Sequence, residues 1–347
     1  MNNSLRPPRH FAIIGAGMAG ISCARTLVQT GHVVTVFEKE DEPGGRMATC
    51  DSAFGTFDTG TQYFTARGPR FIMALETSPK LCKRWSANTV QVIDESGKVS
   101  SASATEAHWV GVPNMKSLVA GWADDLAGHM ELQTSVTHIV PDTLEPGRWQ
   151  LHTAYPDGAQ RVFSGFDAVL LALPNVPARQ LLQNSKLLES WCHAIEAVQT
   201  APCWTLMLAF PQAMQPDLST LGPQWNVARS THHRIAWLAR ESSKPGRDTV
   251  ERWTVQASNA WSQEHLYDDF ARVQTKLLKA FAEVTGIRTL PAYVASRRWL
   301  YAKTTQPLGY SHLWQAQRGL GVCGDWCLGH RVEDAFVSGL ELALAVV

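Results

Sequence analysis

The feature that most constrains the fold is a glycine turn between a short apolar strand and a helix. Residues 11–14 predict a buried strand, and Gly15, Gly17 and Gly20 follow it in the spacing G-x-G-x-x-G. The first glycine permits a tight turn, the second lets the main chain approach a pyrophosphate, and the third lets helix and strand pack closely. Residues 21–29 then predict a helix, and Gly31 stands in a position suited to its C-cap.

The strand that follows this helix ends at a carboxylate. Residues 33–37 form the continuous apolar run of a parallel strand buried on both faces, and Glu38 comes next. A carboxylate there can accept hydrogen bonds from both ribose hydroxyls, and the helix N-terminus offers its free N–H groups to phosphates. The order strand, glycine turn, helix, strand and acid therefore predicts a Rossmann-type dinucleotide-binding domain.

Two further motifs favour FAD over a nicotinamide dinucleotide. Residues 44–46 read Gly-Gly-Arg, and Arg46 can bridge a pyrophosphate, although a surface turn is the alternative. Residues 319–323 predict a third buried strand, and Asp325 follows it. An Asp at this end of the sheet can bind the ribityl chain, which NAD lacks, although it can also be a cap or turn residue. Residues 332–347 predict a last helix, whose N-terminus suits the flavin pyrimidine edge.

The remaining patterns complete an α/β fold with a second domain. Between the motifs we expect a helix at 115–126, a strand at 130–140, a turn at 157–158 and a strand at 166–173. From about residue 184 the pattern of predicted elements changes. It predicts strands at 204–210, 235–239 and 253–257 and a helix at 262–284. We therefore expect a discontinuous Rossmann-type FAD-binding domain (1–75, 110–183 and 319–347) and a mixed α+β substrate domain (76–109 and 184–318).

The composition restricts the partners and the location. Lys+Arg and Asp+Glu both number 31, so the chain lacks the basic excess that nucleic-acid binding needs. Apolar runs such as 168–173 are far too short to span a bilayer. The seven cysteines have no regular spacing, which predicts reduced thiols in the cytoplasm, no metal site, and a packing role for Cys327.

Several segments together resemble the flavin amine oxidase superfamily and, within it, the bacterial renalases most. They are residues 15–20, Glu38, 44–47, 57–65 and 323–332, with further support from 109–113, 237–240 and 299–302. The resemblance runs across nearly the whole chain. Its glycine motifs are shared by many FAD enzymes, whereas Gln-Tyr-Phe-Thr at 62–65 combined with Gly-Asp-Trp-Cys at 324–327 is more specific to renalases.

This resemblance implies a non-covalent FAD and a substrate pocket above the flavin. The residues implied to touch FAD, besides the turn glycines Gly15, Gly17, Gly20 and Gly45, are Met18, Glu38, Arg46, Gln62, Val136, Asp325 and Val332. Val136 enters as the strand residue whose main chain meets the adenine. The residues implied to line the substrate pocket are Tyr63, Phe64, Thr65, Arg67 and Arg331.

The implied activity is oxidation of the 2- and 6-dihydro isomers of NAD(P)H to NAD(P)⁺, with oxygen as acceptor and hydrogen peroxide as product. Because rearomatisation of a dihydropyridine drives hydride release, no catalytic acid or base is assigned. One alternative is a flavin amine oxidase for another organic amine, with an aromatic cage of Tyr63, Trp204 and Trp299. The other alternative is a non-catalytic flavin-binding redox sensor.

Overall fold

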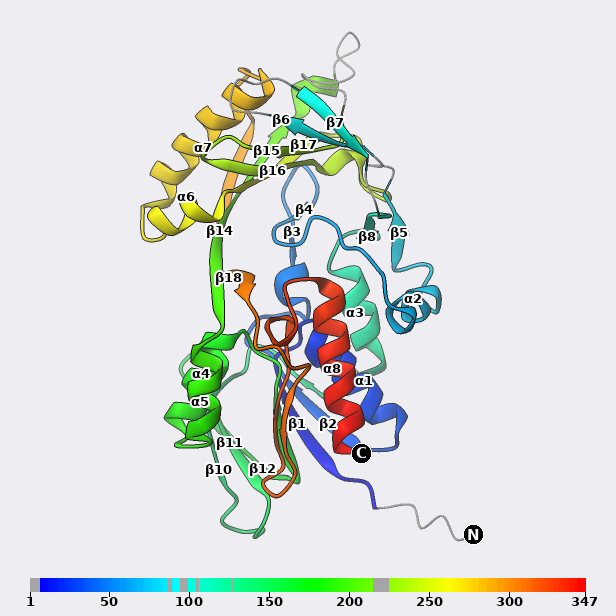
Figure 1. The fold of residues 1–347 in the computed structure, drawn as a ribbon, viewed down its shortest axis with the longest axis vertical. Coiled ribbons are helices and arrows are strands. Elements are labelled where there is room, and N and C mark those ends of the chain that lie inside the picture. Colours follow the sequence, from blue (N-terminus) through cyan, green and yellow to red (C-terminus); the bar gives the residue numbers. More distant parts are fainter. Residues whose placement is uncertain (1–6, 86–88, 94–98, 104–105, 127, 215–224) are drawn as a thin grey trace. The chain divides into compact units, whose positions relative to one another are not determined.

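The chain folds into two compact units, and each unit combines segments that are far apart in the sequence (Figure 1). A computed structural model describes residues 7–85, 89–93, 99–103, 106–126, 128–214 and 225–347. Unit 1 consists of Met1–Gly45, Val119–Gln199 and Thr304–Val347. Unit 2 consists of Arg46–Leu118 and Thr200–Lys303.

Unit 1 contains the predicted Rossmann-type sheet. Its strands are β1 (His10–Ile14), β2 (Val33–Phe37), β9 (Met130–Glu131), β13 (Ala168–Leu171), β19 (Leu313–Gln315) and β20 (Leu320–Val322). They are ordered β19-β20-β13-β1-β2-β9, and every pair is parallel except β19 with β20. The mainly apolar runs at 11–14, 33–37, 168–171 and 320–322 occupy the middle of this sheet, as the sequence predicts.

Helices α1 (Met18–Gln29) and α8 (Val332–Val346) pack against each other in unit 1 (Figure 1). Their contact is very close at Gly339, where an added Cβ would lie 2.0 Å from the carbonyl oxygen of Ala19. α1 ends where expected, with Thr30 as C-cap and Gly31 next at a positive φ of 86°.

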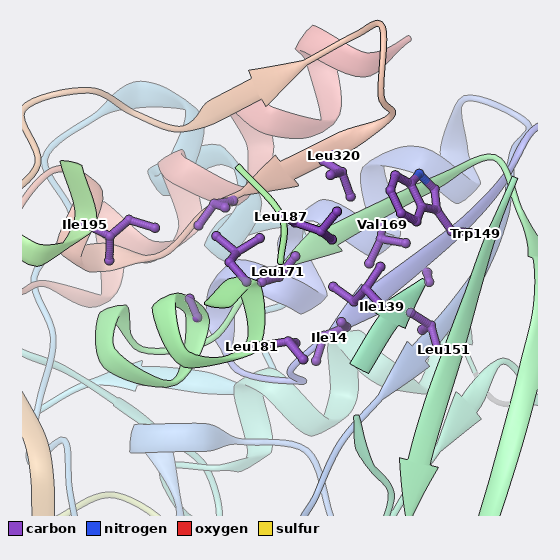
Figure 2. Packing of buried hydrophobic residues seen from close by; sticks show 14 of the residues in the cluster. Ile14, Ile139, Trp149, Leu151, Val169, Leu171, Leu181, Leu187, Ile195 and Leu320 are labelled. Atoms are coloured by element: carbon purple, nitrogen blue, oxygen red, sulfur yellow. The ribbon is translucent and has the colours of Figure 1, made fainter. Parts of the chain in front are cut away.

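A second sheet and two helices complete the hydrophobic core of unit 1 (Figure 2). They are β10 (Ser135–Pro141), β11 (Trp149–Ala154), β12 (Gln160–Phe166), α4 (Asn175–Asn184) and α5 (Glu189–Glu196). Ile14 and Leu171 of the parallel sheet share one buried cluster with Leu151 of β11, Leu181 of α4 and Ile195 of α5. β11 and β12 form the hairpin predicted from Asp157-Gly158.

Unit 2 is built on a seven-stranded sheet. Its strands are β6 (Thr89–Ile93), β7 (Val99–Ser103), β14 (Gln199–Phe210), β15 (Val227–Ser230), β16 (Ile235–Arg240), β17 (Glu251–Ala257) and β18 (Tyr293–Gln306), ordered β18-β14-β17-β16-β15-β6-β7. One face packs on helix α7 (Phe270–Thr285) through Leu206, Val255 and Phe281. On the other face, Met207 and Ala209 pack with Phe57.

The remaining elements are short. They are η1 (Gly45–Met47), β3 (Thr49–Cys50), β4 (Phe57–Asp58), α2 (Pro69–Glu76), β5 (Cys82–Arg84), β8 (Trp109–Gly111), α3 (Ser117–Ala123), η2 (Asp124–Leu126), η3 (Pro211–Met214), η4 (Glu241–Ser243), α6 (Asn259–Glu264) and η5 (Asp325–Cys327). Among the described residues, no helix is both long enough and apolar enough to cross a membrane.

The units differ from the predicted domain boundaries. Residues 46–75 and 110–118 belong to unit 2, because Phe57 of β4 packs with Met207 and Ala209 of β14. Residues 184–199 and 304–318 belong to unit 1, where α5 contributes Ile195 to the core.

Two predicted elements are each divided in the structure. The strand at 130–140 is β9 and β10, separated by a turn in which Gln133 has a φ of +51°. The helix at 262–284 is α6 and α7, because Asp269 caps a new start by accepting a hydrogen bond from the N–H of Ala271.

Candidate functional site

The three glycines of the turn are required for different reasons. Gly15 has a φ of +106°, and a Cβ there would lie 2.7 Å from the carbonyl oxygen of Ala172. A Cβ on Gly20 would lie 1.9 Å from the carbonyl oxygen of Gly15. At Gly17 the nearest atom is the Cα of Gly45, 3.9 Å away, so the protein itself would admit a side chain there. The space at Gly17 is what a pyrophosphate lying on the main chain needs.

The second glycine pair packs on the first turn. Gly44 has a φ of +152°, and its N–H donates a hydrogen bond to the carbonyl oxygen of Ala16 over 3.0 Å. Gly45 has a φ of +56°, and a Cβ there would lie 3.2 Å from the Cα of Gly17. Met18 begins α1, whose first turn has neither a capping side chain nor an acidic residue. Two glycine segments and an uncapped helix N-terminus therefore meet at one anion-binding surface.

Glu38 lies at this turn, with its carboxylate held by main-chain groups. Oε2 accepts from the N–H of Ala16 at 2.7 Å, and Oε1 accepts from the N–H of Glu40 at 3.1 Å. The side chain is largely buried, and burial raises the pKa of Glu38 although both N–H bonds act in the opposite direction. The N–H of Thr134 donates to the Glu38 carbonyl oxygen, which brings the segment leading to Val136 to the same place. The structure therefore places Glu38 and the Val136 segment together.

The segment after β20 supplies the remaining predicted FAD residues of unit 1. Asp325 begins η5 and is 3% exposed, and Val332 begins α8. The N–H groups of His330 and Arg331 donate to Asp334 Oδ2 over 3.0 and 2.9 Å, so Arg331 is the N-cap residue of α8 and its side chain is only partly buried.

Cys327 has the packing role that the sequence predicts. Its side chain is fully buried, and burial raises the pKa of its thiol well above the usual value. A buried, protonated thiol is unreactive.

Arg46 and Gln62 belong to unit 2, where they hold one tightly constrained segment, here called the Gln62 loop (residues 59–63). The Arg46 carbonyl oxygen accepts from the N–H of Thr61 at 2.9 Å, and the Arg46 guanidinium donates to the Tyr301 carbonyl oxygen at 3.4 Å. A Cβ on Gly60 would lie 2.3 Å from the same Arg46 oxygen. Residues 46 and 62, separate in the sequence, are therefore brought together.

Side chains of the seven-stranded sheet also bind the Gln62 loop. Trp299 of β18 donates from Nε1 to the Thr59 carbonyl oxygen at 2.8 Å. Gln256 of β17 donates from Nε2 to the Gly60 carbonyl oxygen at 2.6 Å. The part of the loop before Gln62 is thus fixed by main-chain and side-chain bonds together.

A buried charge cluster lies beneath this loop, and sequence reasoning missed it. Lys244 Nζ donates to Asp58 Oδ2 at 2.9 Å, to Glu241 Oε1 at 2.8 Å and to Gln62 Oε1 at 3.1 Å. Arg247 Nη2 donates to Asp58 Oδ2 at 2.7 Å. All four charged side chains are at most 1% exposed, so two acids and two bases neutralise one another out of water.

The pKa values of the two carboxyls of the cluster are shifted in opposite directions. Burial by itself would raise the pKa of Asp58, but the charges of Lys244 and Arg247, with hydrogen bonds from Lys244 and the Met115 N–H, lower it to about 2. Burial dominates at Glu241 and raises its pKa. The spacing of Glu241, Lys244 and Arg247, three residues apart, is the one signal in the sequence that indicates such a cluster.

The predicted substrate residues fall into different environments. The centroid of the Tyr63 ring lies 4.0 Å from the ring centroid of His108 and 5.3 Å from that of Trp237. Tyr63 is only partly buried. Phe64 is instead 3% exposed and packs against Phe71, so it contributes to the core, and its pocket-lining role stays a prediction.

The other predicted substrate residues are distributed over both units. Thr65 is partly buried, and Arg67 forms an ion pair with Glu106. Tyr63, Thr65 and Arg67 belong to unit 2, whereas Arg331 belongs to unit 1.

The aromatic cage considered for an amine substrate is not assembled as predicted. Trp204 is fully buried in the core on the α7 side of the sheet, and its Nε1 donates to the His265 carbonyl oxygen. The Nε1 of Trp299 already donates its hydrogen bond to the Thr59 carbonyl oxygen. Alternate residues of a strand point to opposite faces, and Trp204 shares a face with Leu206, not with Thr205 and its neighbour Gln256.

Comparison with known proteins gives the family. Residues 101–347 match the family described as flavin containing amine oxidoreductase, and residues 13–76 match the NAD(P)-binding Rossmann-like domain. The chain belongs to the flavin-containing amine oxidoreductase family. The cofactor of this chain is FAD, and the glycine segments, Glu38 and the buried Asp325 fit that dinucleotide.

Individual relatives match this chain over short segments. The L-amino-acid oxidase of Daboia russelii is 52% identical over 42 residues, 12% of this chain and 8% of that protein. The phytoene dehydrogenase of Streptomyces griseus is 42% identical over 59 residues, 17% of this chain and 12% of that protein. The matches therefore span only about a tenth of the length of these relatives.

Solved structures share the fold of this chain over almost its full length. Cyclohexylamine oxidase from Brevibacterium oxydans superposes with a TM-score of 0.71 at 14% identity, covering 98% of this chain and 99% of that one. Putrescine oxidase bound to putrescine superposes with a TM-score of 0.69 at 11% identity, with the same coverage. At such identities the likeness shows the fold alone.

Proposed function

We propose that this oxidoreductase is a renalase-like oxidase of the 2- and 6-dihydro isomers of NADH and NADPH, acting in the cytoplasm. Bound FAD supplies the hydride acceptor, oxygen is the final acceptor, and the products are NAD(P)⁺ and hydrogen peroxide. The support from the sequence is the combination of Gln62-Tyr63-Phe64-Thr65 with Gly-Asp-Trp-Cys at 324–327. The support for the location is that all seven cysteines are free thiols.

One structural observation carries the preference for a nucleotide over a cationic amine. The carboxylates of Asp58 and Glu241, buried beside the Gln62 loop, are already neutralised by Lys244 and its neighbour Arg247. This cluster therefore offers no uncompensated negative charge to an ammonium group. A partly exposed guanidinium such as that of Arg331 can bind a carboxamide or a phosphate.

The residues of the chain would then bind and orient the substrate without moving a proton. Tyr63, stacked with Trp237 at an interplanar angle of 30°, gives a flat surface suited to a dihydropyridine ring. Arg331 would hold the carboxamide or a phosphate, and so fix which carbon–hydrogen bond is presented. Rearomatisation drives the release of hydride, so no general base is needed.

The test is an anaerobic titration of the FAD-loaded protein, followed by its absorbance near the flavin maximum. The additions are the separately prepared 2- and 6-dihydro isomers of NADH and NADPH, ordinary NADH as control, and then amines such as putrescine and cyclohexylamine. We expect rapid bleaching by the dihydro isomers, and formation of hydrogen peroxide once air is admitted.

The other outcomes would decide between the alternatives. Bleaching by amines and not by the dihydropyridines would reject the proposal in favour of an amine oxidase. A flavin that none of the compounds bleaches, although dithionite reduces it, would favour a flavin-binding redox sensor.

A further inference from the structure

The two halves of the Gln62 loop are held in different ways. Before Gln62, the loop is tied by main-chain bonds: Thr59 N–H donates to the Ala48 carbonyl oxygen at 3.0 Å, and Thr61 N–H to that of Arg46. The chain is next paired at Phe64, whose N–H donates to the Trp109 carbonyl oxygen at 2.8 Å. Between these points the Gln62 side chain closes the loop on itself, since its Nε2 donates to the carbonyl oxygens of Asp58 and Gly60.

The Gln62 carboxamide has only one favourable orientation. Gln62 is 4% exposed, so its amide group cannot turn to water. A reversed amide would place Oε1 against two carbonyl oxygens and the NH₂ group against the ammonium of Lys244. Lys244, which donates to Oε1 at 3.1 Å, therefore fixes the orientation together with the two carbonyl oxygens that accept from Nε2.

Lys244 is itself fixed by the rest of the charge cluster. Its three N–H groups have three acceptors, on Asp58, Glu241 and Gln62, and its side chain is 0% exposed. The Trp85 ring lies 5.7 Å from Nζ, and Thr254 Oγ1 donates to the same Glu241 oxygen that Lys244 binds. All three N–H groups of the ammonium are therefore bonded within the protein, and one of them fixes the Gln62 side chain.

We propose that Lys244 is a positioning residue: through the Gln62 carboxamide it sets the conformation of the loop that carries Gln62 and Tyr63. The inference rests on the proposed function, because the resemblance assigns FAD to Gln62 and substrate to Tyr63. It goes beyond that function in assigning a role to Lys244, Asp58 and Glu241, whose side chains are all fully buried.

The test uses a charge-balanced variant, since Lys244→Met alone would leave two buried acids facing one base. In Glu241→Gln/Lys244→Met, Asp58 and Arg247 still form a neutral pair. A second variant, Gln62→Leu, keeps all four charges and removes only the amide. The matched control is Arg240→Met/Glu251→Gln, which removes another buried ion pair of the same sheet, with an Nε–Oε1 distance of 3.0 Å, and keeps Lys244 and Gln62.

Three measurements are made on the FAD-loaded proteins: the limiting rate of anaerobic reduction, the half-saturating substrate concentration, and hydrogen–deuterium exchange of peptides covering residues 57–64. In Glu241→Gln/Lys244→Met we expect the limiting rate to fall about tenfold to hundredfold, because orientation is lost, with little change in half-saturation. Exchange should rise in the loop peptide and stay at the parent level in β14 and β17. Gln62→Leu should show the same changes. The triple variant Gln62→Leu/Glu241→Gln/Lys244→Met, which combines both sets of substitutions, should be reduced no more slowly than Glu241→Gln/Lys244→Met.

The control and the contrary results separate positioning from mere stability. The Arg240→Met/Glu251→Gln protein should unfold at lower denaturant and still be reduced at the parent rate. Parent rate and parent loop exchange in Glu241→Gln/Lys244→Met would overturn the proposal, as would additive losses in the triple variant. If no dihydropyridine reduces the parent, the proposed function has failed, and loop exchange alone then decides whether Lys244 orders the Gln62 loop.

Discussion

At the scale of single residues, Gly17 and Gly20 show that one motif can hold glycines for unrelated reasons. Gly20 is needed by the fold, because a Cβ there would lie 1.9 Å from the Gly15 carbonyl oxygen. Gly17 is not needed by the fold, because its nearest neighbour would be 3.9 Å from a Cβ. Gly17 is therefore required for cofactor binding, whereas Gly20 is required for folding.

We expect Gly17→Val to abolish retention of FAD without unfolding the protein, since the side chain takes the place of the pyrophosphate. The measurements are the FAD-to-protein absorbance ratio after gel filtration and the melting temperature of the apoprotein. Gly20→Val is the matched comparison and should lower the melting temperature of the apoprotein itself. Full FAD retention in Gly17→Val would move the phosphate site elsewhere.

Asp325→Ala tests the assignment of the ribityl chain. Asp325 is 3% exposed in η5, and loss of a charge-assisted hydrogen bond should weaken FAD binding by about 1–3 kcal/mol. Titration of the apoprotein with FAD, followed by flavin fluorescence, measures the change. Asp157→Ala, in the exposed turn between β11 and β12, is the control and should bind FAD as the parent does. Equal affinities for both variants would reduce Asp325 to a turn residue.

Arg331→Ala separates binding of substrate from binding of FAD. The main chain of Arg331 is held by Asp334, so the N-cap geometry should survive loss of the guanidinium. We expect an unchanged flavin spectrum and slower anaerobic reduction by the dihydropyridines, because the carbon–hydrogen bond is no longer oriented. Stopped-flow reduction measures it, and a parent rate at the parent substrate affinity would exclude Arg331 from the substrate site.

At the scale of elements, the contact of α1 with α8 is a test of how packing supports the cofactor. A Cβ at Gly339 would lie 2.0 Å from the Ala19 carbonyl oxygen, so Gly339→Val must force the helices apart. Overpacking of this kind costs about 1–3 kcal/mol. We expect lower stability in denaturant and weaker FAD binding, since Ala19 lies in the first turn of α1. Leu344→Ala, on an exposed position of α8, is the control and should change neither.

The elements differ in how far the sequence predicts them. Strands β1, β2, β13 and β20 are predicted because burial on both faces demands continuous apolar runs. β18 was missed, because this edge strand carries Arg297, Arg298 and Lys303 among half-exposed positions, and its pattern resembles that of a surface segment.

The candidate site was predicted where its residues are neighbours in the sequence and missed where they are not. The glycine turn with Glu38 lies within one βαβ unit, so spacing alone indicates it. The charge cluster joins Asp58 to Lys244, 186 residues further along the chain, and no local pattern relates such positions.

At the scale of the whole molecule, the charge cluster predicts a specific loss of stability in acid. The pKa of Asp58 is lowered from 3.8 to about 2 in the folded protein. A lowered folded pKa contributes stability above pH ~4, which is lost as the pH falls toward ~2 and amounts to about 2 kcal/mol.

We expect the guanidine midpoint of the parent to fall more steeply than that of Asp58→Asn as the pH is lowered from ~5 to ~2.5. At neutral pH the variant should be the less stable protein, because Lys244 and Arg247 keep their charges without this acceptor. Parallel pH profiles for the two proteins would show that Asp58 titrates normally.

The interleaving of the two units has a consequence for how the protein is made. The chain passes between them at residues 45, 118, 199 and 303, and β13 lies between β1 and β20, which is synthesised about 150 residues after β13. During translation the glycine turn and Glu38 therefore leave the ribosome well before Asp325 and before α8, which packs on α1. The nascent chain must therefore hold an unfinished parallel sheet until residues 320–346 emerge, and FAD can be captured in full only after that.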